Sequence, residues 1–147
     1  MTARTCDDPS SSPLEVVRQC FAAWSAGDLT SVIDHMSDDC IYDLHVPTDV
    51  LPYGGQHEGK AAILDALRSI RAEFHFLVWE MNGLRQDGDI VRGQIIFYFK
   101  DRATGEIMDG RSRHLSRVIG GKIVSIDEFH DVEKLRAFVA LARSYKF

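Results

Sequence analysis

The sequence predicts an α+β fold in which helices pack on one side of a long antiparallel sheet. The first half of the chain carries helical periodicity, and the second half carries strand-forming runs separated by short turns. Helices followed by hairpin-connected strands are typical of the α+β class, whereas alternating strands and helices would indicate a parallel sheet. With 147 residues and no internal repeat, the chain is predicted to form a single domain over residues 13–147.

Two short helices are predicted at the start of this domain. Ser12 can cap the first helix, with Pro13 at its first position and Glu15 three residues after the cap. Its apolar residues recur on one face, namely Leu14, Val17, Phe21 and Trp24. Gly27 supplies a left-handed stop. Asp28 then caps a second helix, whose apolar stripe is Leu29, Val32, Ile33 and Met36.

A short strand, a loop and a third helix follow. Residues 40–45 are predicted to form the strand, and prolines and paired glycines indicate a loop over residues 46–57. The third helix is predicted over about residues 60–72, with Ile63, Leu64, Leu67 and Ile70 as its apolar stripe.

The rest of the chain is predicted to form two hairpins and a last helix. The strands are expected at residues 73–84, 90–100, 106–119 and 122–129. The turns between them carry glycine and aspartate at 86–89 and 101–105, and two glycines at 120–121. Asp131 caps the final helix, whose buried face is predicted to be Leu135, Phe138, Val139 and Ala142.

Composition excludes several classes of function. The formal net charge is −5 and no basic run occurs, which argues against a nucleic-acid partner. No apolar run approaches the ~18 residues of a membrane span. Residues 1–12 are polar and carry Asp7 and Asp8, so we expect a disordered tail rather than a signal peptide. We therefore expect a cytoplasmic protein with no membrane partner.

Cysteine and histidine spacing indicates neither disulfides nor metal. The three cysteines are odd in number and match no zinc pattern, which favours reduced thiols, with Cys20 and Cys40 as small core residues. The histidines at 45, 57, 75 and 130 show no metal-ligand spacing either. We expect no metal site.

From Arg18 to His45 the chain is similar to the opening of the ketosteroid isomerases. The motifs that carry the resemblance are Ala-Gly-Asp-Leu at 26–29, Asp-Asp at 38–39, Gly-Gly-Lys-Ile at 120–123 and Asp-Glu-Phe-His-Asp at 127–131. With the order of helices and hairpins, it covers about residues 14–135. The chain is identified as a member of the SnoaL-like and ketosteroid isomerase-like group of the nuclear transport factor 2-like superfamily. This implies a curved, cone-like half barrel in which three N-terminal helices and a C-terminal helix enclose one pocket, with no cofactor.

Two departures from the ketosteroid isomerase pattern argue against that activity. The family's oxyanion-donating tyrosine falls on Cys20, and its aspartate base falls on Leu44. Steroid isomerisation needs a carboxylate to move the proton and acidic donors to stabilise the enolate. A shift of one residue would bring Asp43 to the base position, but strand alternation turns Asp43 to the opposite face from Leu44.

The resemblance points to His114 and Glu128 as catalytic residues instead. His114 falls on the family's second oxyanion donor, and Glu128 falls on the acid/base aspartate of SnoaL-like cyclases and limonene epoxide hydrolases. Small residues share the strand face of His114, and burial would raise the pKa of Glu128. The plainer interpretations are a core histidine satisfied by a hydrogen bond and a glutamate in a salt bridge. The Asp-Arg-Asp set of the hydrolases is disfavoured, because Asp109 and Arg111 lie on the face opposite His114.

The second hairpin turn predicts how these two residues meet. Pairing about Gly120-Gly121 joins residues whose numbers add to about 241, which places His114 opposite Asp127 and one diagonal step from Glu128. A bulge at the turn would shift this register by one. Such a slip would reverse the side of the sheet that Glu128 faces.

Six further residues are predicted to line the pocket. Tyr42, His45 and Tyr53 offer hydroxyl and imidazole groups, and Tyr53 lies in a loop that can close the pocket mouth; each can equally be structural. The apolar wall is predicted from Trp24, Phe97 and Phe99.

The predicted function is binding of a small hydrophobic ligand, with cofactor-free acid/base chemistry on a carbonyl compound. The reaction would be of the cyclase, isomerase, dehydratase or hydrolase type. Glu128 would act as base or acid, and His114 would stabilise the enolate or relay the proton. The alternative is a non-catalytic ligand-binding or assembly module, because this fold hosts many functions. A homodimer is expected through the outer sheet face that carries Arg111, Arg113, Leu115 and Arg117.

Overall fold

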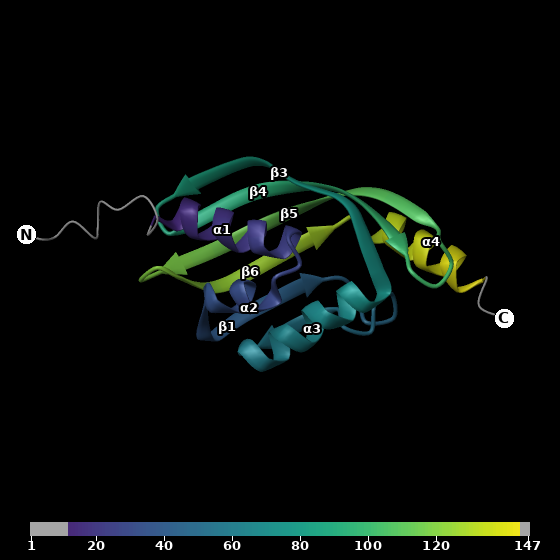
Figure 1. The fold of residues 1–147 in the computed structure, drawn as a ribbon, viewed down its shortest axis with the longest axis horizontal. Helices are drawn as coiled ribbons and strands as arrows, with labels where there is room; N and C mark the ends of the chain where they lie inside the picture. The colour runs from purple at the N-terminus through teal and green to yellow at the C-terminus, as the bar shows by residue number, and fades with distance from the viewer. Residues whose placement is uncertain (1–11, 145–147) are drawn as a thin grey trace, which may run out of the picture.

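Helices and strands follow the predicted order along the chain, with one additional short strand at residues 55–58 (Figure 1). The computed structural model describes residues 12–144, so the predicted tail over residues 1–12 lies, apart from Ser12, outside the described residues. The helices are α1 (Pro13–Ser25), α2 (Leu29–Asp34), α3 (Lys60–Glu73) and α4 (Val132–Arg143). The strands are β1 (Met36–His45), β2 (Gly55–Glu58), β3 (Phe74–Asp87), β4 (Ile90–Asp101), β5 (Ile107–Ile119) and β6 (Lys122–His130).

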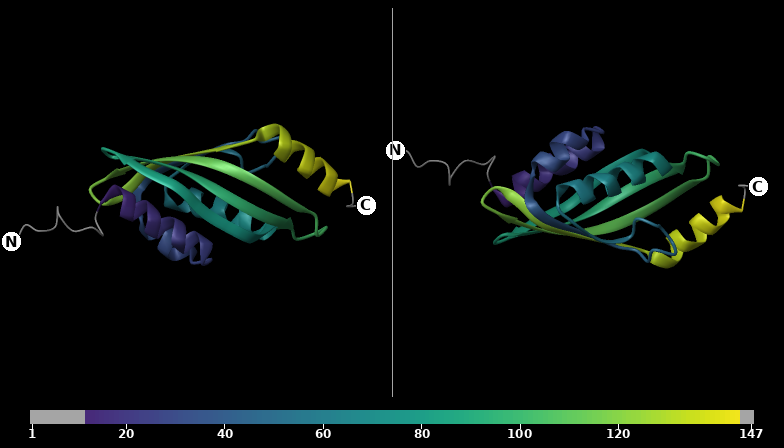
Figure 2. Two further views of the ribbon diagram at one scale, coloured as in Figure 1. Left: turned by 90° about the horizontal axis from the view of Figure 1, so that it is seen from above. Right: turned by 90° about the horizontal axis from the view of Figure 1, so that it is seen from below.

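The strands form one curved, unclosed sheet in the order β2-β1-β6-β5-β4-β3. Neighbouring strands are antiparallel except β1 and β6, which run parallel. Helices α1, α2 and α3 cover one face of the sheet, and α4 lies at the end of the sheet away from the start of α1 (Figures 1 and 2). The predicted α+β class and the cone-like architecture are confirmed. No helix within residues 12–144 is long and apolar enough to cross a bilayer.

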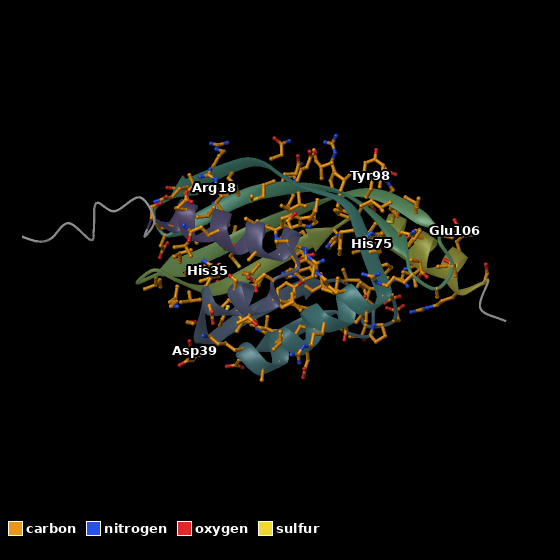
Figure 3. All side chains as sticks on the ribbon, viewed as in Figure 1. Arg18, His35, Asp39, His75, Tyr98 and Glu106 are labelled. Atoms are coloured by element: carbon orange, nitrogen blue, oxygen red, sulfur yellow. The ribbon has the colours of Figure 1, made fainter. Side chains whose placement is uncertain are left out.

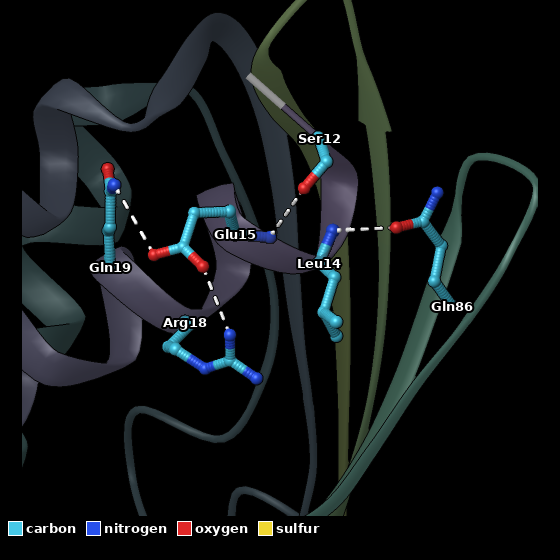
Figure 4. A network of polar contacts seen from close by, with 6 residues as sticks. All are labelled: Ser12, Leu14, Glu15, Arg18, Gln19 and Gln86. Atoms are coloured by element: carbon cyan, nitrogen blue, oxygen red, sulfur yellow. Dashed lines mark hydrogen bonds and ion pairs between the residues drawn. The ribbon is translucent and has the colours of Figure 1, made fainter. Parts of the chain in front are cut away.

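The predicted helix caps are confirmed. Ser12 Oγ accepts a hydrogen bond from the Glu15 N–H at 3.2 Å, and the Glu15 carboxylate in turn bonds Arg18 at 3.0 Å (Figure 4). The Leu14 N–H donates to Gln86 Oε1 at 3.1 Å, which ties the start of α1 to the end of β3. Side chains therefore satisfy backbone N–H groups that the first turn of α1 leaves without a helical partner.

Several element boundaries differ from the prediction: β3 extends to Asp87, past the predicted end at residue 84, and two further differences concern β1 and β2. Met36 begins β1 rather than ending the second helix, because it pairs with Ile123 of β6 and is buried there. Part of the predicted loop over 46–57 forms β2, which pairs with residues 41–44 of β1. The strand β2 lies at the sheet edge and its residues are partly or fully exposed. An edge strand of this kind shows no apolar alternation by which a sequence could reveal it.

The two faces of the sheet carry different side chains. On the concave face of β5, Ser112, His114, Ser116 and Val118 are buried, as alternation predicts. On the outer face, the arginines at 111, 113 and 117 are exposed. Tyr98, labelled in Figure 3, is one of several exposed large apolar residues of the structure. At the far end of the sheet, Phe138 of α4 packs against Phe99 at a ring distance of 5.5 Å.

Candidate functional site

A cavity of about 100 Å³ lies between the concave face of the sheet and α1–α3. Its wall is mostly apolar and comes from both helices and strands. The lining includes seven of the eight predicted site residues, Trp24, Tyr42, Tyr53, Phe97, Phe99, His114 and Glu128. A few polar groups in an apolar cavity are the usual composition of a site for a small ligand.

His114 and Glu128 face each other directly across β5 and β6. The predicted register, which placed His114 opposite Asp127, is wrong by one residue. Near the turn, Val118 pairs with Ile123 as predicted, but a bulge shifts the pairing before Arg117, which lies opposite Ser125. An extra residue in one strand leaves that residue unpaired and moves every later pair by one. The bulge is therefore what brings Glu128, rather than Asp127, onto the face of His114.

Glu128 is held by hydrogen bonds to both carboxylate oxygens. The Tyr42 hydroxyl donates to Oε1 at 2.8 Å, and His130 Nε2 lies 2.6 Å from Oε2. Burial and the adjacent carboxylate raise the pKa of Tyr42 well above its usual value, so this hydroxyl keeps its proton and remains a donor. The strands position the pair Glu128 and His130 because residues two apart on one strand face the same side.

The charge state of Glu128 differs from the prediction. Burial raises the pKa of Glu128, as expected, but the electrostatic effect of His114, the hydrogen bond and charge of His130 and the bond from Tyr42 outweigh it. Together they lower the pKa of Glu128 to about 2. The sequence prediction of a raised value is therefore wrong, because it considered desolvation without these partners. Glu128 is a carboxylate at neutral pH.

His114 is buried, with 9% of its surface exposed, and one of its ring nitrogens has no hydrogen-bond partner within the described part of the chain. Its Nε2 lies 3.0 Å from Ser112 Oγ, while Nδ1 is buried with no hydrogen-bond partner among residues 12–144. Burial lowers the pKa of His114 and so favours the neutral ring. The nearby Glu128 opposes this effect but does not outweigh it. If the Ser112 hydroxyl donates to Nε2, Nδ1 carries the proton and is a free donor. A buried polar atom without a hydrogen bond destabilises the folded state, and a ligand or water molecule that bonds it would remove this penalty.

Two residues of this network, Ser112 and His130, were not predicted as site residues. The spacing Glu128-x-His130 carries a signal for the second of them, because it places both side chains on one strand face. The combined arrangement offers a carboxylate that can accept a proton and, beside it, an imidazole nitrogen that can bond a ligand oxygen. These are the two groups that proton transfer next to a carbonyl requires.

The structure does not place His45 in the cavity, where the sequence predicted it. Leu44 lines the cavity, so alternation turns both Asp43 and His45 to the outer face. There, His45 Nε2 lies 2.8 Å from Asp127 Oδ1 and 3.7 Å from Asp43 Oδ2. Tyr53 does line the cavity, and its hydroxyl donates to Glu73 Oε1 at 2.8 Å.

A second hollow of about 330 Å³ adjoins the start of α4. It shares Phe97 and His130 with the cavity and is otherwise more polar, with Arg111 and Lys134 in its wall. Gly110 lines this hollow, and a Cβ atom there would lie 2.5 Å from the Phe97 ring. The Phe97 ring therefore depends on glycine at this position for its place in the cavity wall.

Comparison with known proteins gives a family and a fold. Residues 17–126 match the model of the SnoaL-like domain. A nuclear transport factor 2-like protein from Burkholderia thailandensis is 23% identical, with a TM-score of 0.75 over 90% of this chain and 97% of that one. TerC, co-crystallized with polyporic acid, is 17% identical, with a TM-score of 0.74 over 88% and 99%.

A third structure is a protein with a ketosteroid isomerase-like fold from Catenulispora acidiphila, in complex with trimethylamine. It is 16% identical, with a TM-score of 0.72 over 86% of this chain and 92% of that one. The comparison with curated proteins gives no significant match. At these identities the structural similarities establish the fold.

Proposed function

This chain belongs to the SnoaL-like domain family, and we propose from that membership and the cavity that it is a cofactor-free acid/base enzyme. Its substrate would be a small, largely apolar compound with a carbonyl group. The observation that carries the proposal is a largely buried carboxylate opposite an imidazole whose Nδ1 has no hydrogen-bond partner among residues 12–144, in a mostly apolar cavity. Names of similar structures, which include an isomerase-like fold and a polyketide cyclase, agree with this class of chemistry.

In the proposed reaction, Glu128 accepts a proton from the carbon next to the carbonyl. The electron pair of that C–H bond moves to the carbonyl oxygen, which becomes an enolate oxygen. His114 donates from Nδ1 to this oxygen, with Ser112 holding the ring in the required tautomer. Glu128 then returns the proton to the same or another carbon, which completes an exchange or an isomerisation. Donors aimed at a developing oxyanion are worth about 10²–10³ in rate.

A specific observation favours the alternative, a non-catalytic ligand-binding module. Both oxygens of Glu128 already accept hydrogen bonds, and the pKa of this carboxyl is lowered to about 2. A general base is most effective with a pKa near the working pH, so Glu128 is a weak base as long as those bonds persist.

Solvent exchange separates the two candidates without knowledge of the natural substrate. The chain is mixed with a small aryl ketone such as 1-indanone in D₂O, and loss of the α-proton signal is followed by NMR. We expect exchange above the buffer rate, reduced to that rate in Glu128→Gln and unchanged in Glu80→Gln, an exposed control on β3. Binding is followed separately by the fluorescence of Trp24 and Trp79, which line the cavity. Binding without exchange above buffer would favour the module.

Steroid ketone isomerisation is expected to stay at background. Leu44 lines the cavity at the position of the family's base, and burial raises the pKa of Cys20 to about 12, so its thiol is a poor acid. Turnover of a Δ5-3-ketosteroid at rates typical of the authentic isomerases would contradict this expectation.

We also propose that two copies pair through the outer face of the sheet. The pairing region is the part of this face formed by β4 and β5, which exposes Arg111, Arg113 and Arg117, with Tyr98 exposed at 46%. Light scattering should give twice the 16.6 kDa of one chain at micromolar concentration. Arg113→Glu, placed in the middle of the arginine row, should lower the measured mass, whereas a 16.6 kDa particle for the natural chain would exclude pairing.

A further inference from the structure

Three side chains that can ligate a metal converge on the outer face of β1 and β6. Asp43 and Asp127 are direct partners in the parallel register of these strands, and His45 lies two residues further along β1, on the same face. One ligand atom from each residue lies within 4.8 Å of the other two. Both strands are paired on each side within the sheet, so the backbone positions of the potential ligands are fixed.

The imidazole of His45 is oriented toward both carboxylates. Phe129, its register partner on β6, stacks on the ring with centroids 4.2 Å apart and an interplanar angle of 11°. With the ring plane held in this way, Nε2 lies 2.8 Å from Asp127 Oδ1 and 3.7 Å from Asp43 Oδ2. The orientation is therefore independent of any ion.

The cluster also lacks a permanent cation. Most other acidic side chains in ion pairs between residues 12 and 144 have a lysine or arginine partner, as in Asp38–Lys60, Asp49–Arg136, Asp89–Arg117 and Asp109–Lys134. Asp43 and Asp127 share only His45 in that part of the chain. Like charges directly opposite each other on neighbouring strands are destabilising. A bound cation would remove this repulsion.

We propose that Asp43, His45 and Asp127 form a binding site for a divalent transition-metal ion of the zinc class. One imidazole nitrogen and two carboxylate oxygens are a donor set that Zn²⁺ accepts, whereas Mg²⁺ prefers oxygen alone. The three side chains are each 30–36% exposed, which leaves the fourth position of a tetrahedral ion to water. The site is separate from the cavity, because these residues face the opposite side of the sheet from Glu128.

The observed spacing fits such an ion with a small adjustment. Metal–ligand distances of about 2.0–2.2 Å place tetrahedral ligand atoms roughly 3.4 Å apart. The 3.7 Å between His45 Nε2 and Asp43 Oδ2 is close to this value. The 2.8 Å contact between His45 and Asp127 has to open by less than about 1 Å, which side-chain torsions can supply.

The histidine spacing along the chain could not indicate this site. His45 and Asp127 are 82 residues apart, and the parallel pairing of β1 with β6 brings them together. Close sequence spacing of ligands is typical of zinc loops and helices, not of sites built across strands.

Calorimetric titration of the EDTA-treated, dialysed full-length chain with ZnCl₂ at pH 7 tests the proposal. We expect one ion per chain, and an affinity lowered at least tenfold in His45→Asn and in Asp127→Asn. Loss of even an outer partner of a metal ligand lowers affinity by about 10–100-fold. The matched control is Asp38→Asn, an exposed carboxylate on the same strand β1, which should bind as the natural chain does.

The remaining outcomes would overturn the proposal. Absence of saturable binding at millimolar Zn²⁺ excludes the site. Equal affinity in the natural chain and both variants places the ion elsewhere. Circular dichroism confirms folding of each variant, and Asp43→Asn, which keeps the imidazole, replaces any variant that fails to fold. Because none of these residues lines the cavity, the result is independent of ketone exchange.

Discussion

Asp127 and Glu128 are neighbours on β6, and each carboxylate bonds a histidine, but they face opposite sides of the sheet. Glu128 bonds His130 at 2.6 Å inside the cavity, and Asp127 bonds His45 at 2.8 Å on the outer face. The side chain of Glu128 is 17% exposed and that of Asp127 is 35% exposed. The two pairs are similar in geometry, so their differences in behaviour must come from their surroundings.

The comparison indicates how burial changes the role of the same chemical pair. In the cavity, water cannot screen charges, so each neighbour of Glu128 acts strongly on its protonation. On the outer face, water and ions reach the carboxylates of Asp43 and Asp127, so they can exchange partners. We infer that the inner pair is suited to proton transfer and the outer pair to reversible ligation.

The largest expected difference between the two pairs is in stability. Glu128→Ala leaves His130 and Tyr42 without their buried partner, and breaking a buried pair lowers the free energy of unfolding by about 3–5 kcal/mol. Asp127→Ala removes a half-exposed partner and should lower it by about 1 kcal/mol or less. Urea unfolding followed by circular dichroism measures both. Equal losses would show that burial does not separate the pairs.

The response to acid should differ next. The pKa of Glu128 is lowered from its ordinary 4.5 to about 2, so the folded state stabilises the charged form. This contribution is complete above about pH 4.5 and is lost as the pH falls toward 2; it is on the order of 3 kcal/mol. Glu128→Gln should therefore flatten the fall of the unfolding free energy over this range. In Asp127→Asn the steep fall should remain, and parallel curves for Glu128→Gln and the natural chain would contradict the assignment.

A substitution at Gly110 tests how firmly the cavity wall is packed. In Gly110→Ala the new methyl group would come within 2.5 Å of the Phe97 ring, which must move. Overpacking of this kind lowers the free energy of unfolding by about 1–3 kcal/mol. Arg111 is the next residue along β5 and is exposed on the outer face. Arg111→Ala should change the free energy of unfolding by less than about 0.5 kcal/mol. A thermal or urea melt checks both, and a tolerated alanine would show that the inner wall adapts.

The smallest effect is expected from the hydroxyl that orients His114. Ser112→Ala removes the 3.0 Å contact to Nε2 and should lower the free energy of unfolding by about 1 kcal/mol. Its matched control is Ser125→Ala on β6, which should lie within about 0.5 kcal/mol of the natural chain. NMR of the His114 ring nitrogens would detect the accompanying change of tautomer. An unchanged tautomer would remove Ser112 from the proposed role.

The predictable parts of this molecule depend on local interactions. Ser12, Asp28 and Asp131 cap their helices through residues three positions along the chain, so the sequence reveals them. The class of fold followed in the same way from periodicity and turns. The outward position of His45 could also have been predicted. Leu44 beside it lines the cavity, and neighbouring residues of a strand face opposite sides of the sheet.

The rest depends on contacts that no local pattern encodes. The partners of Glu128 come from β1 and from its own strand, and without them desolvation alone predicted the opposite pKa shift. Likewise, both possible registers of β5 and β6 satisfy the alternation of polar and apolar residues. Only the observed bulge decides between Asp127 and Glu128.

That bulge makes the chemistry of the cavity depend on the number of residues as well as on their identity. Loss of one codon between Ser125 and the Gly120-Gly121 turn would remove the extra residue of the bulge and leave His114 opposite Glu128 in a regular ladder. If the undeleted strand paired without the bulge, an aspartate and a phenylalanine would replace a glutamate and a histidine in the cavity. Related chains with and without this extra residue can therefore present the same side chains to His114, and alignments that ignore a gap here would compare residues from opposite faces of the sheet.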